Sequence, residues 1–148
     1  MTATTPKAAD ARPANDAGAV RFCEMIFPEQ ANHYGTLFGG HALSLMGKAA
    51  FVAATRRARS PVVMATSEMI EFHTPVRVGE LVELTARVER VGRSSMTVVV
   101  DLVSEVLVSG HRCLAVRGSF EMVAVDDAGK PTPITSSSAL QSVEETLP

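Results

Sequence analysis

The chain has 148 residues, of which 46% are hydrophobic, and it carries a formal net charge of -2. This length predicts one domain with a sizeable core, and the charge balance excludes an electrostatic attraction to nucleic acid or to an anionic membrane. The first residues carry charges and prolines and lack an apolar core. We therefore expect no secretory signal and, by default, a cytoplasmic location.

The chain begins with a segment, residues 1–18, whose Ala, Thr, Pro and Asp content predicts a flexible arm. A short strand over residues 20–27 follows and ends at a proline. Residues 42–54 then form the one long apolar segment that lacks a two-residue alternation. Apolar side chains fall on nearly every side of a helical wheel there, which predicts a helix surrounded by protein.

Four further strands are expected over residues 62–74, 81–91, 94–108 and 111–125, with a two-residue hairpin at residues 109–110. The alternation in 81–91 indicates a sheet with one buried face. These strands are expected to be antiparallel neighbours that wrap the helix, giving an α+β domain over residues 19–125. Residues 126–148 are predicted to be a polar tail. The open edges of such a sheet favour dimerisation.

Two cysteines, Cys23 and Cys113, fall in predicted strands and have no metal-ligand spacing. We expect a pair of buried thiols in a reduced compartment, with a disulfide as the alternative. No two histidines have a metal-ligand spacing either, so no metal site is expected.

Two motifs carry a resemblance to a known family. Residues 32–40, NHYGTLFGG, lead into the helix, and residues 70–79, IEFHTPVRVG, end the following strand. Together they resemble the acyl-CoA thioesterases of the hotdog superfamily, over about residues 19–125. The resemblance implies an antiparallel sheet around one long helix and hydrolysis of an acyl-CoA to a free acid and coenzyme A. It also implies sites at the subunit interface of a dimer, tetramer or hexamer, and no cofactor, because coenzyme A enters with the substrate.

The glycine pair at the helix start, Gly39 and Gly40, suits thioester chemistry. Without side chains, these residues let an acyl group approach backbone N–H groups that can stabilise an oxyanion. The alternative is that they only permit a tight loop. By the resemblance, Asn32 binds the thioester carbonyl or orients water; its alternative role is to bond its own backbone.

A catalytic carboxylate is missing from the helix. In the family an aspartate commonly follows the helix methionine, but here Met46 is followed by Gly47. Glu68 is the substitute we predict as general base, because the face that it shares with Ile70 and Phe72 is expected to look toward the helix. Pairing of Glu68 with a cation is the alternative. We expect His73 and Glu71 to form a structural pair.

Coenzyme A contacts are predicted at two places: the turn before the strand over residues 94–108 and the C-terminal end of the helix. The turn around Arg93, Ser94 and Ser95 resembles the segment that lines the pantetheine channel in these enzymes. Arg56 and Arg57 are further phosphate ligands, expected from another subunit. Alternatively these arginines are solvated or complement the helix dipole.

Gly47 also keeps two rival functions open. The chain is a non-catalytic acyl-CoA binding or regulatory protein if hydrolysis has been lost. It is a hotdog enoyl-CoA hydratase or dehydratase if a histidine and a carboxylate meet at the helix. Acyl chain preference is not readable from the sequence.

Overall fold

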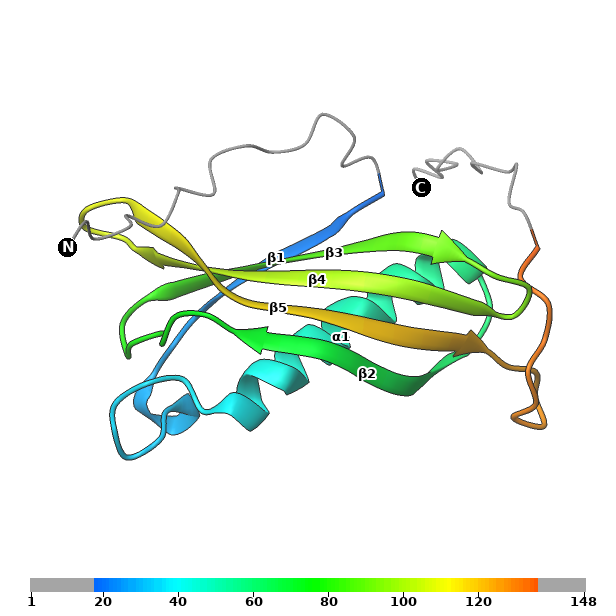
Figure 1. Cartoon of the computed structure of the whole chain (residues 1–148), viewed down its shortest axis with the longest axis horizontal. Coiled ribbons are helices and arrows are strands. Elements are labelled where there is room, and N and C mark those ends of the chain that lie inside the picture. The colour runs from blue at the N-terminus through cyan, green and yellow to red at the C-terminus, as the bar shows by residue number, and fades with distance from the viewer. Residues whose placement is uncertain (1–17, 136–148) are drawn as a thin grey trace, which may run out of the picture.

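The computed structural model describes residues 18–135, which form an antiparallel sheet curved around a single long helix (Figure 1). The elements are β1 (Val20–Met25), a short 3-10 turn (Pro28–Gln30), α1 (Gly39–Ala58), β2 (Val62–Phe72), β3 (Leu81–Val91), β4 (Ser95–Val106) and β5 (His111–Ala124). The predicted α+β architecture is confirmed. Residues 1–17 of the predicted arm and residues 136–148 of the predicted tail lie outside the described residues.

The sheet has the strand order β1-β3-β4-β5-β2, so β1 and β2 are its edges. β2 pairs with β5 and not with β3. The four later strands are antiparallel neighbours, as expected, in the order β3-β4-β5-β2. The chain leaves the helix on the side of the sheet opposite β1, pairs there with β5, and then crosses back to place β3 beside β1.

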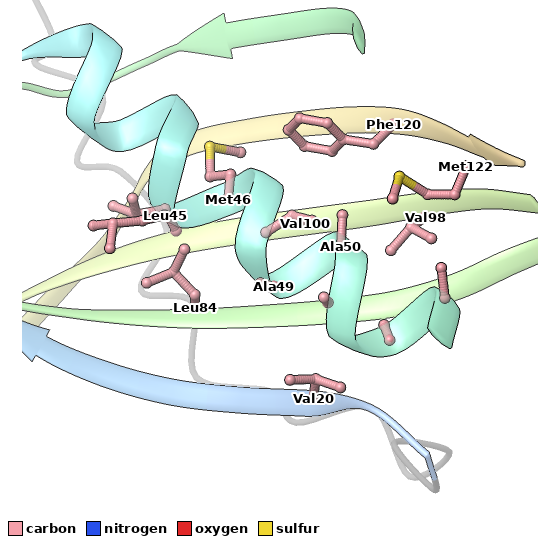
Figure 2. Packing of buried hydrophobic residues seen from close by; sticks show 14 of the residues in the cluster. Val20, Leu45, Met46, Ala49, Ala50, Leu84, Val98, Val100, Phe120 and Met122 are labelled. Carbon is pink, nitrogen blue, oxygen red and sulfur yellow. The ribbon is translucent and has the colours of Figure 1, made fainter. Parts of the chain in front are cut away.

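The core lies between α1 and the concave face of the sheet (Figure 2). Met46 is fully buried and lies with Phe120 and Val100 in this layer. Small side chains such as Ala49 and Ala50 let the helix approach the strands closely. Each large buried side chain contributes roughly 1.5–3 kcal/mol through removal of apolar surface from water.

Two irregularities in β2 change which side chains face the helix. The pairing with β5 shifts between Met64 and Thr66 and again between Glu68 and Glu71, and Met69 takes a left-handed φ of 50°. Glu68 is paired with Ser119 on the outer face of the sheet, whereas Ile70 reaches inward. The expectation that Glu68 looks toward the helix is therefore wrong, because a bulge reverses the alternation of side chains.

Residues 126–135 fold back on the end of the sheet instead of leaving it as a tail. The Oδ1 atom of Asp126 accepts hydrogen bonds from the N–H groups of Ala128, at 2.9 Å, and Lys130, at 3.0 Å. The N–H of Ile134 donates to the carbonyl of Arg93 at 2.7 Å. The return closes the end of the molecule at which α1 finishes (Figure 1).

The β4–β5 hairpin also differs from expectation. Val106 pairs with His111, so four residues connect the strands and not two. The N–H of Gly110 donates to the carbonyl of Val106 at 2.7 Å, and Gly110 has a φ of 75°. This positive φ favours glycine. The Ser-Gly dipeptide at residues 109–110 therefore marks the position of the turn but does not predict its length.

The cysteines occupy different environments. Cys113 is buried, but Cys23 is exposed on the outer face of β1, so the expectation of two buried thiols is wrong for Cys23; both are free. Residues 18–135 hold no group of three His, Cys, Asp or Glu side chains that could bind a metal ion. Within the same residues no helix is long and apolar enough to cross a membrane. The absence of a cofactor and the cytoplasmic location stay predictions.

Candidate functional site

The loop before α1 is organised by one asparagine side chain. The Oδ1 atom of Asn32 accepts hydrogen bonds from the N–H of Tyr34 at 3.0 Å and from the N–H and hydroxyl of Thr36 at 3.2 and 3.1 Å. Asn32 thus bonds the backbone of its own loop, which is the alternative role that we predicted for it. These bonds fix the amide, and its Nδ2 group has no acceptor among the described residues. Asn32 is therefore oriented as a free donor.

The same loop is tied to the connection between β2 and β3. The N–H of Leu37 donates to the carbonyl of Val76 at 2.7 Å, and the N–H of Val78 donates to the carbonyl of Gly35 at 3.1 Å. Gly35 takes a φ of 78°, which the turn needs. The start of the helix and the end of β2 consequently form one rigid wall.

The first turn of α1 presents unpaired donors. The N–H groups of His41 and Ala42 both bond the carbonyl of Phe38, each at 3.0 Å. Phe38 offers no side-chain cap, and the N–H groups of Gly39 and Gly40 have no acceptor among residues 18–135. Free N–H groups at a helix start carry partial positive charge and bind anions.

Two exposed aromatic rings flank this glycine pair. A Cβ at Gly39 would lie 3.7 Å from Cζ of Phe72, and a Cβ at Gly40 would lie only 2.7 Å from Cε1 of Phe38. The glycines therefore do more than shorten the loop: they let both rings lie against the helix start. An acyl group arriving there meets apolar edges beside polar donors.

An open cavity of about 220 Å³ lies next to these donors. Its walls come from the helix start, the end of β2, the following loop and β5: Leu37, Ala42, Phe72, His73, Thr74, Pro75, Val76 and Val116. The walls are mostly apolar, and of the described residues no carboxylate lines the cavity. Such a cavity suits an acyl chain.

A histidine–carboxylate pair stands at the same place. Nε2 of His73 lies 3.2 Å from Oε2 of Glu71, and both side chains are about half exposed, at 45% and 54%. The predicted pair is thus present. Two-residue spacing on a strand could reveal the pair from sequence, but not that His73 lines a cavity beside the helix start.

The predicted site residues divide into two groups. Asn32, Gly39 and Gly40 lie in the loop and helix start that border the cavity at Leu37 and Ala42, whereas Glu68 lies apart on the outer face of the sheet. The predicted coenzyme A ligands gather at the opposite end of the molecule: Arg56, Arg57, Arg93, Ser94 and Ser95. The guanidinium of Arg57 contacts the carbonyl of Thr135 there at 3.5 Å. A 20-residue helix separates the two groups, a distance of about 30 Å.

The position of the missing carboxylate is packed by an apolar group. A Cβ at Gly47 would lie 3.2 Å from the terminal methyl of Met64 on β2. The methyl group therefore fills the space over this turn of the helix. A carboxylate side chain at residue 47 would compete with that methyl group for the same space.

Comparison with known proteins decides the family. A family model described as the thioesterase superfamily matches residues 34–109. An uncharacterised acyl-CoA thioester hydrolase of Bacillus subtilis, YkhA, is 35% identical over 122 residues, which are 77% of this chain and 71% of the relative. The chain belongs to the hotdog-fold acyl-CoA thioesterases.

Solved structures of this family agree with the fold. An acyl-CoA hydrolase of Staphylococcus aureus, in complex with butyryl coenzyme A and coenzyme A, has a TM-score of 0.76 and 29% identity, covering 80% of this chain and 73% of the hydrolase. An apo-hexameric acyl-CoA thioesterase has a TM-score of 0.77 and 36% identity, covering 79% of this chain and 75% of that one.

Variants of the Staphylococcus aureus hydrolase mark three of its polar residues. In separate structures an asparagine, an aspartate and a threonine are each replaced by alanine. In that protein the aspartate follows the asparagine by fifteen residues, and the threonine follows the aspartate by seventeen.

Proposed function

We propose that this thioester hydrolase converts an acyl-CoA and water to a free carboxylic acid and coenzyme A at the start of α1. The acyl chain enters the apolar cavity, and the thioester carbonyl points at the N–H groups of Gly39 and Gly40. The free amide of Asn32 is a third donor. Preorganised donors of this kind stabilise the negative charge that develops on the carbonyl oxygen.

The observation that carries this proposal is the uncapped helix start beside the cavity. The first N–H groups of a helix are satisfied by a capping side chain, by water or by a ligand. Here Phe38 provides none, and an apolar cavity opens at the same place. An acyl chain with an oxygen that gains charge matches both features.

We further propose that the site is completed by a second copy of the chain that binds along β2. This edge strand has eleven residues, and its middle, residues 63–69, is exposed on both faces. Beside it, Phe51 and Leu43 expose apolar surface on the helix, and Met64 joins the two elements. A long, apolar edge strand is a template for pairing with another chain, and related thioesterases are hexameric.

Symmetry then brings the two groups of predicted residues together. β2 begins directly beyond the C-terminal end of α1 and ends at Phe72, which touches Gly39. If two copies of β2 pair antiparallel about a twofold axis, the end of one strand meets the beginning of the other. Arg56 and Arg57 of one copy would thus approach the helix start of its partner. The turn at Arg93 lies at that same end and would come with them.

A second candidate function rests on Gly47 and Met64. Asn32 and Gly47 have the spacing of the asparagine and aspartate in the Staphylococcus aureus hydrolase, and Gly47 and Met64 have the spacing of its aspartate and threonine. Glycine and a contacting methionine thus stand where that hydrolase has two polar residues. This replacement favours acyl-CoA binding without hydrolysis as the alternative.

Thiol release from acetyl-, butyryl-, octanoyl- and palmitoyl-CoA separates these functions. Release above the uncatalysed rate that depends on Asn32 supports hydrolysis, with Asn32→Ala as the test variant and the distant, exposed His111→Gln as the matched control. Saturable binding measured by calorimetry without release supports the non-catalytic alternative. Hydration of crotonyl-CoA, followed by loss of its enoyl absorbance, would indicate a hydratase.

A further inference from the structure

We propose that His73, oriented by Glu71, is the general base that activates water in this chain, in place of a carboxylate on the helix. The inference rests on the proposed hydrolysis and names the residue that performs its proton transfer. It follows from the position of the pair at the cavity, from the groups around it, and from the failure of the other acids and bases to reach that cavity.

The pair has the geometry of an oriented base. Nε2 of His73 lies 3.2 Å from Oε2 of Glu71, within ion-pair distance. A carboxylate this close to Nε2 favours the tautomer with the proton on Nε2, which leaves the lone pair on Nδ1 to accept a proton from water. A carboxylate behind an imidazole also stabilises the imidazolium that proton transfer creates.

The backbone fixes this pair at the rim of the cavity. The N–H groups of His73 and Thr74 both donate to the carbonyl of Ala115, at 2.8 and 3.3 Å. His73 lines the cavity, and its neighbour Phe72 touches the space over Gly39. The bulge at Met69 lies just before the pair and sets which face each side chain takes. His73 therefore lies at a cavity that borders the helix start, where the N–H groups of Gly39 and Gly40 have no acceptor among residues 18–135.

The charged neighbours of Glu71 pair with each other and leave Glu71 available to orient His73. Arg117, its partner in the strand register, is held instead by Asp101, whose two oxygens lie 2.6 and 3.1 Å from the guanidinium. This hydrogen bonding to Asp101 raises the pKa of Arg117, burial lowers it, and the charges of Asp101, Glu71 and Glu89 raise it further. Arg117 and Asp101 thus form an ion pair behind His73 and Glu71, with Glu89 acting on Arg117 and with Arg87 at 3.7 Å from Asp101.

The competing groups do not meet the substrate. Glu68, whose register partner is Ser119, does not line the cavity. His41 lies 3.9 Å from Glu24, but Glu24 already accepts a hydrogen bond from the Gln30 side chain, and neither His41 nor Glu24 lines the cavity. Gly47 has no side chain. Among the described residues, only His73 combines a titratable side chain with a place in the cavity wall.

The reaction balances with water alone. The Nδ1 lone pair of His73 takes a proton from water as its oxygen forms a bond to the thioester carbon. The resulting oxyanion is stabilised by the N–H groups of Gly39 and Gly40. When the intermediate collapses, the carbon–sulfur bond breaks, and the imidazolium returns the proton to the thiolate of coenzyme A. The products are the carboxylic acid and the free thiol.

Three variants of the full-length chain test the proposal against butyryl-CoA over pH 5 to 9: His73→Gln, Glu71→Gln and the control His111→Gln, whose side chain is exposed at the start of β5. We expect His73→Gln to lower kcat by a factor of about 10² to 10⁴ while KM changes little. It should also remove the loss of rate toward acid. Glu71→Gln should lower kcat less than His73→Gln and leave KM little changed, because only the orientation of the imidazole is lost.

The outcomes separate this inference from the proposed function. Hydrolysis by the wild type with an unchanged kcat and acidic limb in His73→Gln overturns the role of His73 and leaves the hydrolase intact. An absence of hydrolysis in the wild type overturns both. Circular dichroism and thermal unfolding of each variant establish that it folds. If His73→Gln is unstable, His73→Asn replaces it, with butyryl-CoA binding measured by calorimetry: binding retained with turnover lost supports the proposal, and turnover retained overturns it.

Discussion

The terminal methyl of Met64 lies 3.2 Å from the position that a Cβ would occupy on Gly47. The two residues come from neighbouring elements, β2 and α1, and together they form an apolar contact at the middle of the exposed helix face. The contact explains why a single change at either residue is not expected to build a polar site. A carboxylate at residue 47 needs space and a polar neighbour, and Met64 offers neither.

We therefore predict that Gly47→Asp combined with Met64→Thr raises kcat for acyl-CoA hydrolysis by at least about 10-fold, because a positioned carboxylate is a strong general base. Gly47→Asp alone should gain little, since the methionine methyl opposes ionisation of the new side chain. A double-mutant cycle measured by thiol release tests the coupling. In the double variant, His73→Gln should cost less activity than in the wild type.

Gly47→Ala is the matched control for this pair. Alanine removes the conformational cost of glycine in a helix interior, and the flexible methionine end can move by the few tenths of an ångström that a Cβ requires. We expect a gain in stability of about 0.5 kcal/mol with unchanged kcat. A large rise in kcat for Gly47→Ala would show that carboxylate chemistry is not what the double variant adds.

Much of the fold was predictable, because the hydrophobic pattern of the sequence matches the side chains that the fold buries. Residues 42–54 are apolar on nearly all sides, and the structure buries that segment within the sheet. The glycine pair was predictable as a helix start, since both glycines border a sharp change from polar loop to apolar helix. Asn32 was predictable as part of the loop, and its Oδ1 atom accepts the backbone hydrogen bonds that were one of its two expected roles.

The placement of Glu68 was not predictable for a physical reason. A strict alternation puts Glu68 and Ile70 on one face, but two register shifts in β2 put them on opposite faces. Nothing in the composition of residues 62–72 signals a bulge, since Met69 is not a residue that favours a positive φ. The cavity was equally hidden, because it forms where three separated segments meet.

Gly118 is predicted to be intolerant of a side chain. A Cβ there would lie 2.4 Å from Cδ1 of Ile70 and 3.1 Å from Cε of Met46. Gly118→Ala should destabilise the fold by about 1–3 kcal/mol through overpacking, as measured by urea denaturation. Ile70→Val removes the atom in closest approach, so the double variant should lose less stability than the sum of the single changes. Strict additivity would contradict this contact.

Cys23 is predicted to react slowly with alkylating agents although it is exposed. Although the residue is exposed, its thiol is partly desolvated; this desolvation and then the charge of Glu83 raise its pKa above the ordinary value of 9.0, while Arg112 lowers it. The protonated thiol is a poor nucleophile. At pH 8, Glu83→Gln should therefore speed alkylation by iodoacetamide, and Arg112→Gln should slow it, as followed by peptide mass spectrometry. Equal rates in all three proteins would contradict the assignment of these charges.

The same shift predicts a dependence of stability on pH. Because folding raises the pKa of the Cys23 thiol, the folded state holds the proton more tightly than the unfolded state. The resulting contribution to stability is fully present below the unfolded value of 9.0 and is lost as the pH rises through the higher folded value. Cys23→Ser should flatten the fall in unfolding free energy between pH 8 and 10, measured in urea.

Complementation between two defective variants tests whether each site uses two copies of the chain. Asn32→Ala removes a carbonyl donor, and the double change Arg56→Ala with Arg57→Ala removes the basic group at the far end of the helix. In a mixed dimer with shared sites, one site carries both defects and the other carries none. Random mixing after joint refolding should therefore restore about a quarter of the wild-type activity. Activity equal to the average of the separate variants would show that each site is built within one copy.

Phe51→Lys should prevent the recovery by disrupting the apolar helix face, and Val108→Lys, on the exposed hairpin, should not.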